Sequence, residues 1–360
     1  MSFRLPLLSL CLLPLLAAGA AEPSMTRLPA SNANYRYEGR FDRATPDAPV
    51  AIWSGSRIKL DFAGEQLVVV FGPSVDQSVF NVTVDDATEI VEVRAGMRMR
   101  YPWPQKLDAG RHRLEIFKRS EAAKGYATFL GVELVAGAAT WAPADPGYRL
   151  RMAFFGDSIT AGACNEDGAE DQWNDFRTHN YAFSWAHLTA QAWHADDRAM
   201  AYSGMGVITG WEVVKAGEIW DKVYPRPDSV RADLNAWPAD VAFVNLGEND
   251  DSFTAANHQP FPAGFASGYV NLVKAIRQAY PQAEIVLLRG GMMGGAKSPP
   301  YRAAWEAAVN ELEAGDLRVT HYVFEHHSAL HPRVADDRAM ADELTAWLKQ
   351  QPFMAPFLAH

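Results

Sequence analysis

The chain has 360 residues, of which 48% are hydrophobic and 21% are charged, and its formal net charge is −10. This composition excludes a predominantly disordered protein, and the length favours two domains over one. Because no basic excess is available to neutralise phosphates, nucleic acids and anionic membranes are not expected partners. The 11 Trp, 12 Tyr and 18 Phe residues suit either large cores or stacking against ring-shaped ligands.

Residues 1–20 predict a secretory signal peptide. One arginine precedes an apolar run over residues 5–16, and a small-residue Ala-Gly-Ala cleavage site ends the segment. The run is short for a membrane span and contains Pro14, so cleavage is favoured over an anchor. Removal of the leader takes Cys11 away and leaves Cys164 as a single thiol, without an intramolecular disulfide. We therefore expect an exported protein, periplasmic or extracellular, that has no membrane contact after cleavage.

Residues 30–142 predict an all-β sandwich domain. Apolar side chains recur at every second position in several short runs, for example over residues 58–62. Residues 66–71 and 80–84 are expected to form two separate strands, because Gly72-Pro73 between them is typical of a turn. Many short alternating strands separated by turns are characteristic of an antiparallel sandwich or barrel.

Residues 148–355 predict an α/β domain, which follows a Pro- and Gly-rich boundary at 143–147. Apolar runs predict buried strands at 150–155, 241–246, 284–288 and 320–324. Helical spacing of apolar residues predicts helices at 185–192, 265–280, 300–314 and 335–349. Strands that alternate with helices form a parallel sheet covered on both faces, and active groups gather at the carboxyl ends of its strands.

Four short motifs lie where strands or loops of this domain end. Ser158 follows the first strand in the motif Gly-Asp-Ser, and Asp157 is expected to order the turn around it. A serine is a weak nucleophile until a base takes its proton, and His331, in Ser-Ala-Leu-His-Pro, is the candidate base. Gly204 and Asn249 follow two further strands, where a backbone N–H and a side-chain amide could stabilise the oxyanion of acyl transfer.

Taken in chain order, these motifs resemble the four sequence blocks of the SGNH (GDSL-type) hydrolases, which are acyl esterases with a flavodoxin-like three-layer α/β/α domain. The resemblance implies that Ser158 is the nucleophile and His331 the base. It also implies an oxyanion hole that comprises the Ser158 N–H, the Gly204 N–H and the Asn249 amide.

The N-terminal half narrows the resemblance. Tyr-Glu-Gly-Arg-Phe-Asp at 37–42 and Trp-Ser-Gly-Ser-Arg-Ile at 53–58 resemble the start of the jelly-roll domain in carbohydrate esterase family 2. This similarity implies an acetylxylan-esterase-type enzyme that deacetylates polysaccharides such as xylan and glucomannan. It implies no metal and no cofactor, and we expect no obligate protein partner.

Two positions depart from the SGNH pattern. Most of these hydrolases have an Asp three residues before the histidine, which orients the imidazole, whereas this chain has Ser328. Family 2 esterases often lack this Asp, so the resemblance implies a Ser–His dyad. A backbone carbonyl would then accept the His331 Nδ1–H, or Glu325 would replace the Asp. Glu248 stands where Thr is common, and we expect it to be a solvated loop acid.

Other chemistries use some of the same residues. Four histidines within residues 321–331 could form a metal cluster, but their spacing is not a zinc signature. Asp157 and Asp250 could be the paired carboxylates of a glycoside hydrolase, although each lies in a motif where another residue has a role. We expect neither a metal site nor glycoside hydrolysis.

Two further alternatives concern the ligand. The sandwich could be a carbohydrate-binding module that presents Trp53, Trp103 and Trp141, or a structural domain that lends residues to the edge of the cleft. The structural role is favoured. The substrate could also be another small acyl ester, such as an acetylated bacterial glycan, and an acceptor sugar could replace water.

Overall fold

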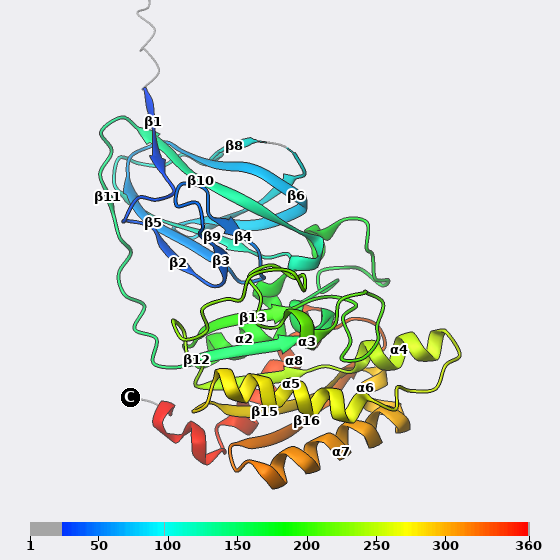
Figure 1. Cartoon of the computed structure of the whole chain (residues 1–360). Helices are drawn as coiled ribbons and strands as arrows, with labels where there is room; N and C mark the ends of the chain where they lie inside the picture. Colours follow the sequence, from blue (N-terminus) through cyan, green and yellow to red (C-terminus); the bar gives the residue numbers. More distant parts are fainter. Residues whose placement is uncertain (1–23, 97, 359–360) are drawn as a thin grey trace, which may run out of the picture.

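The structure is a computed structural model, and it describes residues 24–96 and 98–358. A domain of antiparallel strands lies above a domain in which helices cover a parallel sheet, and a long connection runs down one side (Figure 1). This confirms the predicted fold class, an all-β domain followed by an α/β/α domain. The predicted leader, residues 1–20, lies outside the described residues. No helix of the described part has the length and apolar character needed to cross a membrane.

The N-terminal domain is an antiparallel assembly of eleven strands. Its elements are β1 (Met25–Pro29), β2 (Arg36–Glu38), β3 (Phe41–Asp42), β4 (Val50–Ala51), β5 (Arg57–Ala63), β6 (Leu67–Val84), β7 (Ala87–Arg94), β8 (Met99–Pro102), β9 (Arg111–Lys118), the short 3₁₀ helix η1 (Ala122–Lys124), β10 (Gly125–Val135) and β11 (Thr140–Trp141). Both sides share strand β6, which pairs with β8 and β10 through its first half and with β7 and β9 through its second. The domain is therefore a half-barrel rather than two independent sheets.

The prediction of two separate strands on either side of Gly72-Pro73 is wrong. Strand β6 continues through both residues for a total of 18 residues. Its partner β10 shifts register between Ala127 and Gly131, opposite the point where β6 passes from one side of the half-barrel to the other. Gly and Pro here serve a bend within one strand, because such residues are tolerated in a strand where the ladder is irregular.

The C-terminal domain contains a parallel five-stranded sheet in the order β13-β12-β14-β15-β16. The strands are β12 (Arg151–Gly156), β13 (Asp196–Ala201), β14 (Val241–Asn245), β15 (Glu284–Met292) and β16 (Val319–Ser328). The α-helices are α1 (Ser158–Ala161), α2 (Trp185–Ala192), α3 (Ala216–Ile219), α4 (Glu248–Ala256), α5 (Phe265–Ala279), α6 (Met293–Lys297), α7 (Pro299–Gly315) and α8 (Val334–Leu348). Short 3₁₀ helices are η2 (Phe176–Thr178), η3 (Tyr181–Phe183) and η4 (Pro352–Phe357).

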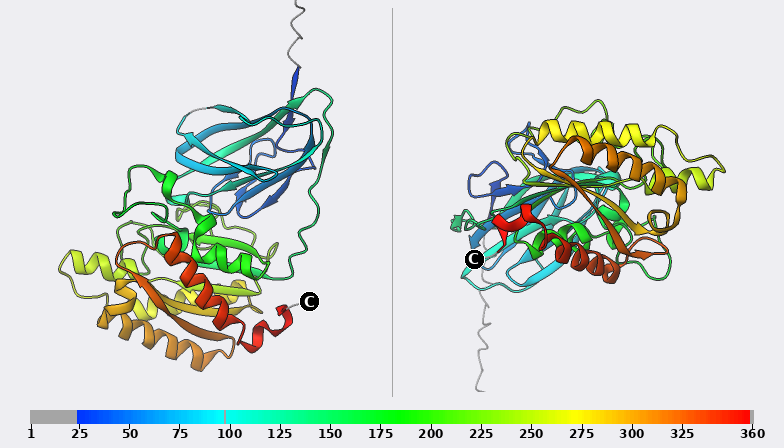
Figure 2. Two further views of the ribbon diagram at one scale, coloured as in Figure 1. Left: turned by 180° about the vertical axis from the view of Figure 1, so that it is seen from behind. Right: turned by 90° about the horizontal axis from the view of Figure 1, so that it is seen from below.

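Alternating side chains of β12 build the two cores of this domain. Phe154 packs into the core that contains α2 and α8, whereas Phe155 packs into the core that contains α5 and α7. Figure 1 shows α5 and α7 in front of the sheet, and the reverse view in Figure 2 shows α8 on the opposite face. The strand order places the ends of β12, β13 and β14 side by side, as is usual for the ligand-binding edge of such sheets.

The two domains share a buried interface. The Arg57 guanidinium of β5 pairs with Asp197 of β13, and both side chains are at most 5% exposed. Trp53 is 1% exposed and donates its indole N–H to the Val223 carbonyl of the other domain at 2.8 Å. Burial of these groups against each other means that the half-barrel supports the α/β domain directly.

The tryptophans proposed as a carbohydrate platform on the half-barrel do not form one. Trp53 and Trp103 are 1% and 8% exposed, and only Trp141 is partly open, at 38%. The Arg111 guanidinium covers the Trp141 ring at 4.6 Å from its centroid. The alternative of an exposed platform made from these three residues therefore does not hold, because Trp53 and Trp103 are buried, and the half-barrel has the contacts expected of the favoured structural role.

Candidate active site

Ser158 lies directly after β12, at the start of helix α1. The tight turn requires glycine at position 156, because a Cβ there would lie 2.1 Å from the Thr160 hydroxyl oxygen. Asp157 caps the helix by accepting the Ile159 N–H at 3.1 Å. His331 follows β16, and its Nε2 lies 2.8 Å from the Ser158 hydroxyl oxygen. The structure thus brings the predicted nucleophile and base into hydrogen-bond contact.

Asp171 orients the imidazole, and sequence analysis missed it. Its Oδ2 lies 2.6 Å from His331 Nδ1, and its Oδ1 accepts a hydrogen bond from Arg333 at 2.8 Å. Burial raises the pKa of Asp171, but the hydrogen bonds from His331 and Arg333 outweigh burial and lower that pKa to about 2. The carboxylate therefore stays ionised and favours the tautomer of His331 that carries its proton on Nδ1.

The predicted Ser–His dyad and the supporting role of Glu325 are both wrong. Glu325 is exposed on β16, and its N–H donates to Glu343. Ser328, in the position of the usual Asp, donates its hydroxyl to the Gly291 carbonyl at 3.2 Å. The place of that Asp is taken by Asp171, which lies 160 positions before His331 in the sequence.

Gly204 is in the loop after β13 and has a left-handed backbone, with φ of +79°. A Cβ at this position would also lie 2.8 Å from Glu212 Cγ, so both conformation and space require glycine. Among residues 24–96 and 98–358, none accepts the N–H of Gly204 or of Ser158 in a backbone or side-chain hydrogen bond. Both donors are therefore available to an oxyanion.

Asn249 lies in the first turn of α4 and lines a pocket that also contains Ser158 and Gly204. Its Nδ2 donates to Asp157 Oδ2 and to the Met205 carbonyl, each at 3.1 Å. The amide thus joins the ends of β12, β13 and β14. For Asn249 to act on an oxyanion, one of these hydrogens must be shared with it, because an amide has two donors.

Carboxylates anchor the backbone around this oxyanion side. Asp250 is fully buried and accepts the N–H groups of three successive residues, Val207, Ile208 and Thr209, at 2.7, 2.8 and 3.0 Å. It therefore holds the far end of the loop that contains Gly204, and this contact excludes Asp250 from glycosidase chemistry.

Burial raises the pKa of Asp157 to about 8, despite the hydrogen bonds that it accepts from Ile159 and Asn249.

Glu248 is not the solvated loop acid that the sequence predicts. It accepts the Gly294 and Gly295 N–H groups at 2.8 and 2.7 Å, and so joins α4 to α6. Burial raises the pKa of Glu248 to about 7, although both backbone hydrogen bonds oppose that shift. A solvated carboxylate shows neither the contacts nor the shift.

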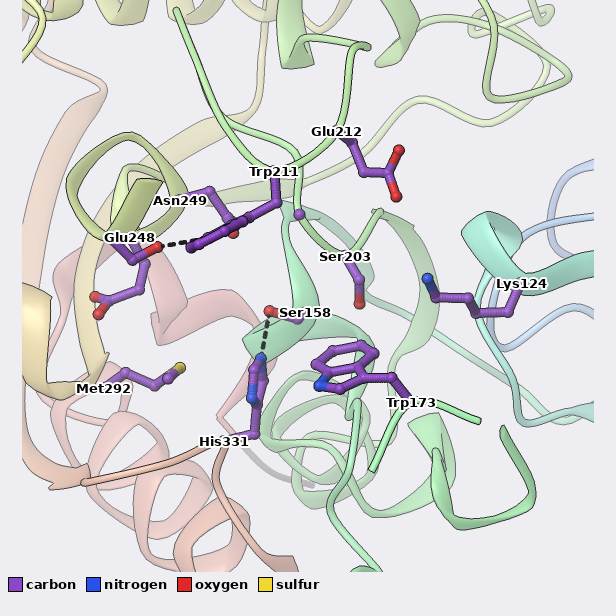
Figure 3. A pocket seen from close by; sticks show the side chains of 12 residues that line it. Lys124, Ser158, Trp173, Ser203, Trp211, Glu212, Glu248, Asn249, Met292 and His331 are labelled. Carbon is purple, nitrogen blue, oxygen red and sulfur yellow. Dashed lines mark hydrogen bonds between the residues drawn. The ribbon is translucent and has the colours of Figure 1, made fainter. Parts of the chain in front are cut away.

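A pocket of about 420 Å³ opens beside Ser158, and Figure 3 shows side chains from both domains around it. Trp173 and Trp211 flank it and are 38% and 56% exposed. The Trp173 and His331 rings form a T-shaped pair, with 5.1 Å between their centroids. Lys124 reaches in from the half-barrel, and its Nζ lies 5.5 Å from the Trp173 ring centroid. The lining residues are Lys124, Ser158, Trp173, Ser203, Gly204, Trp211, Glu212, Glu248, Asn249, Ser252, Met292 and His331.

The four histidines considered as a metal cluster diverge. His321 pairs with Glu313 at 2.6 Å, and His326 pairs with Asp336 at 2.8 Å. His327 Nδ1 lies 3.1 Å from the Glu325 carbonyl oxygen, and His331 contacts Ser158. Within the described ranges, potential ligand groups come together instead around Cys164, with Asp171 and His331 or with Asp167 and His179. Burial raises the pKa of the Cys164 thiol, which disfavours the thiolate that binds metals.

Residues 37–143 match the carbohydrate esterase 2 N-terminal family, and residues 154–345 match the GDSL-like lipase/acylhydrolase family. The chain is 30% identical to cellulase/esterase CelE of Acetivibrio thermocellus over 339 residues, which cover 89% of this chain and 40% of that protein. It is 27% identical to an acetylxylan esterase/glucomannan deacetylase of Cellvibrio japonicus, with 83% and 85% of the two chains covered.

A solved structure of a carbohydrate esterase is similar over the same two domains. A family two carbohydrate esterase from Clostridium thermocellum, in complex with cellohexaose, superposes with a TM-score of 0.77 at 29% identity. The match covers 88% of this chain and 98% of that chain. Both domains, and their order in the chain, are therefore shared with this esterase.

Proposed function

Because the chain belongs to carbohydrate esterase family 2, we propose that it removes O-acetyl groups from plant polysaccharides of the xylan or glucomannan type. The observation that carries this proposal is the chain of contacts Ser158–His331–Asp171, at 2.8 and 2.6 Å, beside a pocket walled by tryptophan. The predicted leader adds export to the proposal.

In this mechanism the Ser158 oxygen attacks the acetyl carbonyl while His331 Nε2 takes the serine proton. Asp171 stabilises the imidazolium that forms. The negative oxygen of the tetrahedral intermediate is held by the Ser158 and Gly204 N–H groups, with Asn249 as a third donor. His331 then protonates the sugar oxygen, which leaves, and a water activated by the same imidazole releases acetate from Ser158.

The walls of the pocket support a neutral sugar as the substrate. Trp173 and Trp211 offer ring faces and edges of the kind that pack against sugar rings, whereas Glu212 and Glu248 place acidic groups nearby. Burial raises the pKa of Glu248 to about 7, and the Lys124 ammonium in the same wall offsets the charge of Glu212, so the pocket offers no strong positive charge to select an acidic sugar. Relatives bear the names acetylxylan esterase and glucomannan deacetylase, and the family esterase from Clostridium thermocellum has been solved with cellohexaose.

We expect Ser158→Ala to abolish acetate release from acetylated xylan and glucomannan, and from a chromogenic acetate, without a change in thermal unfolding. Ser267→Ala, on the exposed side of α5, is the matched control and should behave as wild type. Unchanged hydrolysis by Ser158→Ala would overturn the mechanism. Wild-type activity confined to an acetylated bacterial glycan, or acetyl transfer to an added sugar, would replace the substrate assignment.

A further inference from the structure

Glu121 belongs to the half-barrel, but its carboxylate lies inside the catalytic domain. The residue immediately precedes η1 and is 1% exposed. Its Oε2 accepts the Ser203 N–H at 2.7 Å, and its Oε1 accepts the Ser203 hydroxyl at 2.5 Å. Both oxygens are thus committed to one residue of the loop after β13, and that residue directly precedes Gly204.

The backbone that carries Glu121 is itself held in place. The buried Lys118 side-chain nitrogen donates to the Ser120 and Glu121 carbonyls at 2.7 and 3.2 Å. The Ser120 hydroxyl accepts the Val79 N–H of β6 at 2.9 Å. The position of the Glu121 carboxylate is therefore set by the half-barrel, and the carboxylate transmits that position to the loop.

The contact uses both oxygens of the Glu121 carboxylate. Ser203 presents its N–H and its hydroxyl as donors, and an ionised carboxylate has an acceptor oxygen for each. An alanine at position 121 would leave both donors without this partner, whereas a glutamine could keep the contact by reversing the hydrogen bond to the hydroxyl. Burial raises the pKa of Glu121, but the neighbouring His179, the charge of Lys124 and the Ser203 hydrogen bond outweigh burial and lower that pKa. His179 Nδ1 lies 3.8 Å from Oε1. Glu121 is therefore charged at neutral pH.

We propose that Glu121 is a positioning residue of the esterase: by fixing Ser203, it aims the adjacent Gly204 N–H at the oxyanion. This inference rests on the proposed acyl-transfer function. Two carboxylates then hold the two ends of the loop, Glu121 at Ser203 and Asp250 at Val207 to Thr209. Since Glu121 comes from the other domain, the oxyanion hole is built across the domain boundary.

The test is Glu121→Ala in the full chain, assayed with a chromogenic acetate. Displacement of a catalytic donor by about 1 Å costs up to about 10²-fold, so kcat should fall about 10- to 100-fold while KM stays within about twofold. The matched control is Glu166→Ala, which removes the ion pair between Glu166 and Arg119 across the same interface and should leave kcat unchanged. A purely structural role would lower the Tm in both variants and leave the kcat of the folded enzyme intact.

A double-mutant cycle with Ser203→Ala sharpens the result. If the two residues act as one unit, Glu121→Ala/Ser203→Ala should lose no more kcat than Glu121→Ala alone. Wild-type kcat in Glu121→Ala overturns the inference and leaves the proposed function intact. Failure of the wild-type protein to hydrolyse any acetate would overturn the proposed function instead. If Glu121→Ala does not fold, Glu121→Asp withdraws the carboxylate by one methylene, and wild-type kcat in that variant overturns the inference equally.

Discussion

The two halves of the active site use carboxylates in different ways. On the proton-transfer half, Asp171 contacts the catalytic imidazole at 2.6 Å. On the oxyanion half, Glu121 and Asp250 contact the backbone of the loop that carries Gly204, and neither lines the pocket. The first carboxylate acts on the charge and tautomer of a reacting group, whereas the other two act on the position of a donor.

This difference also appears in burial. Asp171 is 15% exposed and shares its charge with Arg333, so water and a guanidinium help to solvate it. Glu121 and Asp250 are at most 1% exposed, and N–H and hydroxyl donors replace the water that they lose. A substitution in the first half should therefore change the chemistry of the imidazole, and one in the second half should change geometry.

The largest effect is expected on the proton-transfer half. Asp171→Asn should lower kcat by about 10⁴-fold, because an amide favours the wrong histidine tautomer and does not stabilise the imidazolium. Glu325→Gln is the matched control and should keep wild-type kcat, since the side chain is exposed and does not contact His331. Steady-state kinetics of both variants on a chromogenic acetate test whether Asp171 or Glu325 supports His331. A larger loss of kcat in Glu325→Gln would contradict the assignment of Asp171.

The residues that could be predicted from sequence are those tied to strand ends. Ser158 and Asn249 follow the apolar strands β12 and β14, and parallel topology brings such ends to one edge of a sheet. His331 follows β16 at the same edge. Gly204 follows β13, whose first three residues are charged, so its motif and not an apolar pattern indicated its place.

The residues that were missed act through contacts distant in sequence. Asp171 lies in an acidic loop where several carboxylates are equally plausible, and only folding shows which one meets His331. Glu121 lies 82 positions before Ser203 and in the other domain. Helix α4 was missed for a related reason, since its buried face includes Asn249, Asp250 and Thr254 and so lacks an apolar period.

A smaller effect is expected for the third oxyanion donor. Asn249→Ala should lower kcat by about 10²-fold with little change in KM, which is the usual loss for one donor. Its hydrogens also join Asp157 to Met205, so the variant should unfold at a lower temperature than wild type. Asn257→Ala at the exposed end of the same helix is the control. Equal kcat in the two variants would remove Asn249 from the oxyanion hole.

The smallest expected effect is on the pH dependence of stability and concerns Glu248. Like Glu121, Glu248 anchors backbone N–H groups, but its pKa is raised, whereas that of Glu121 is lowered. The pKa of Glu248 is about 7 in the folded protein against an ordinary value of 4.5. Below about pH 4.5 both folded and unfolded states are protonated. Between about pH 4.5 and 7 only the unfolded state ionises, so stability falls as pH rises, and above about 7 this fall ends.

We expect this group to cost about 1–2 kcal/mol of folding free energy at pH 8, because partial exposure reduces the effect of the shift. Glu248→Gln should remove that part of the slope, since the amide stays neutral at every pH and keeps one oxygen for the Gly294 or Gly295 N–H. Tm measured from pH 4.5 to 8 tests this, with exposed Glu306→Gln on α7 as the control that should follow wild type. Parallel curves for Glu248→Gln and wild type would show that Glu248 is ionised in the fold, as Glu121 is, and that the two anchors are alike.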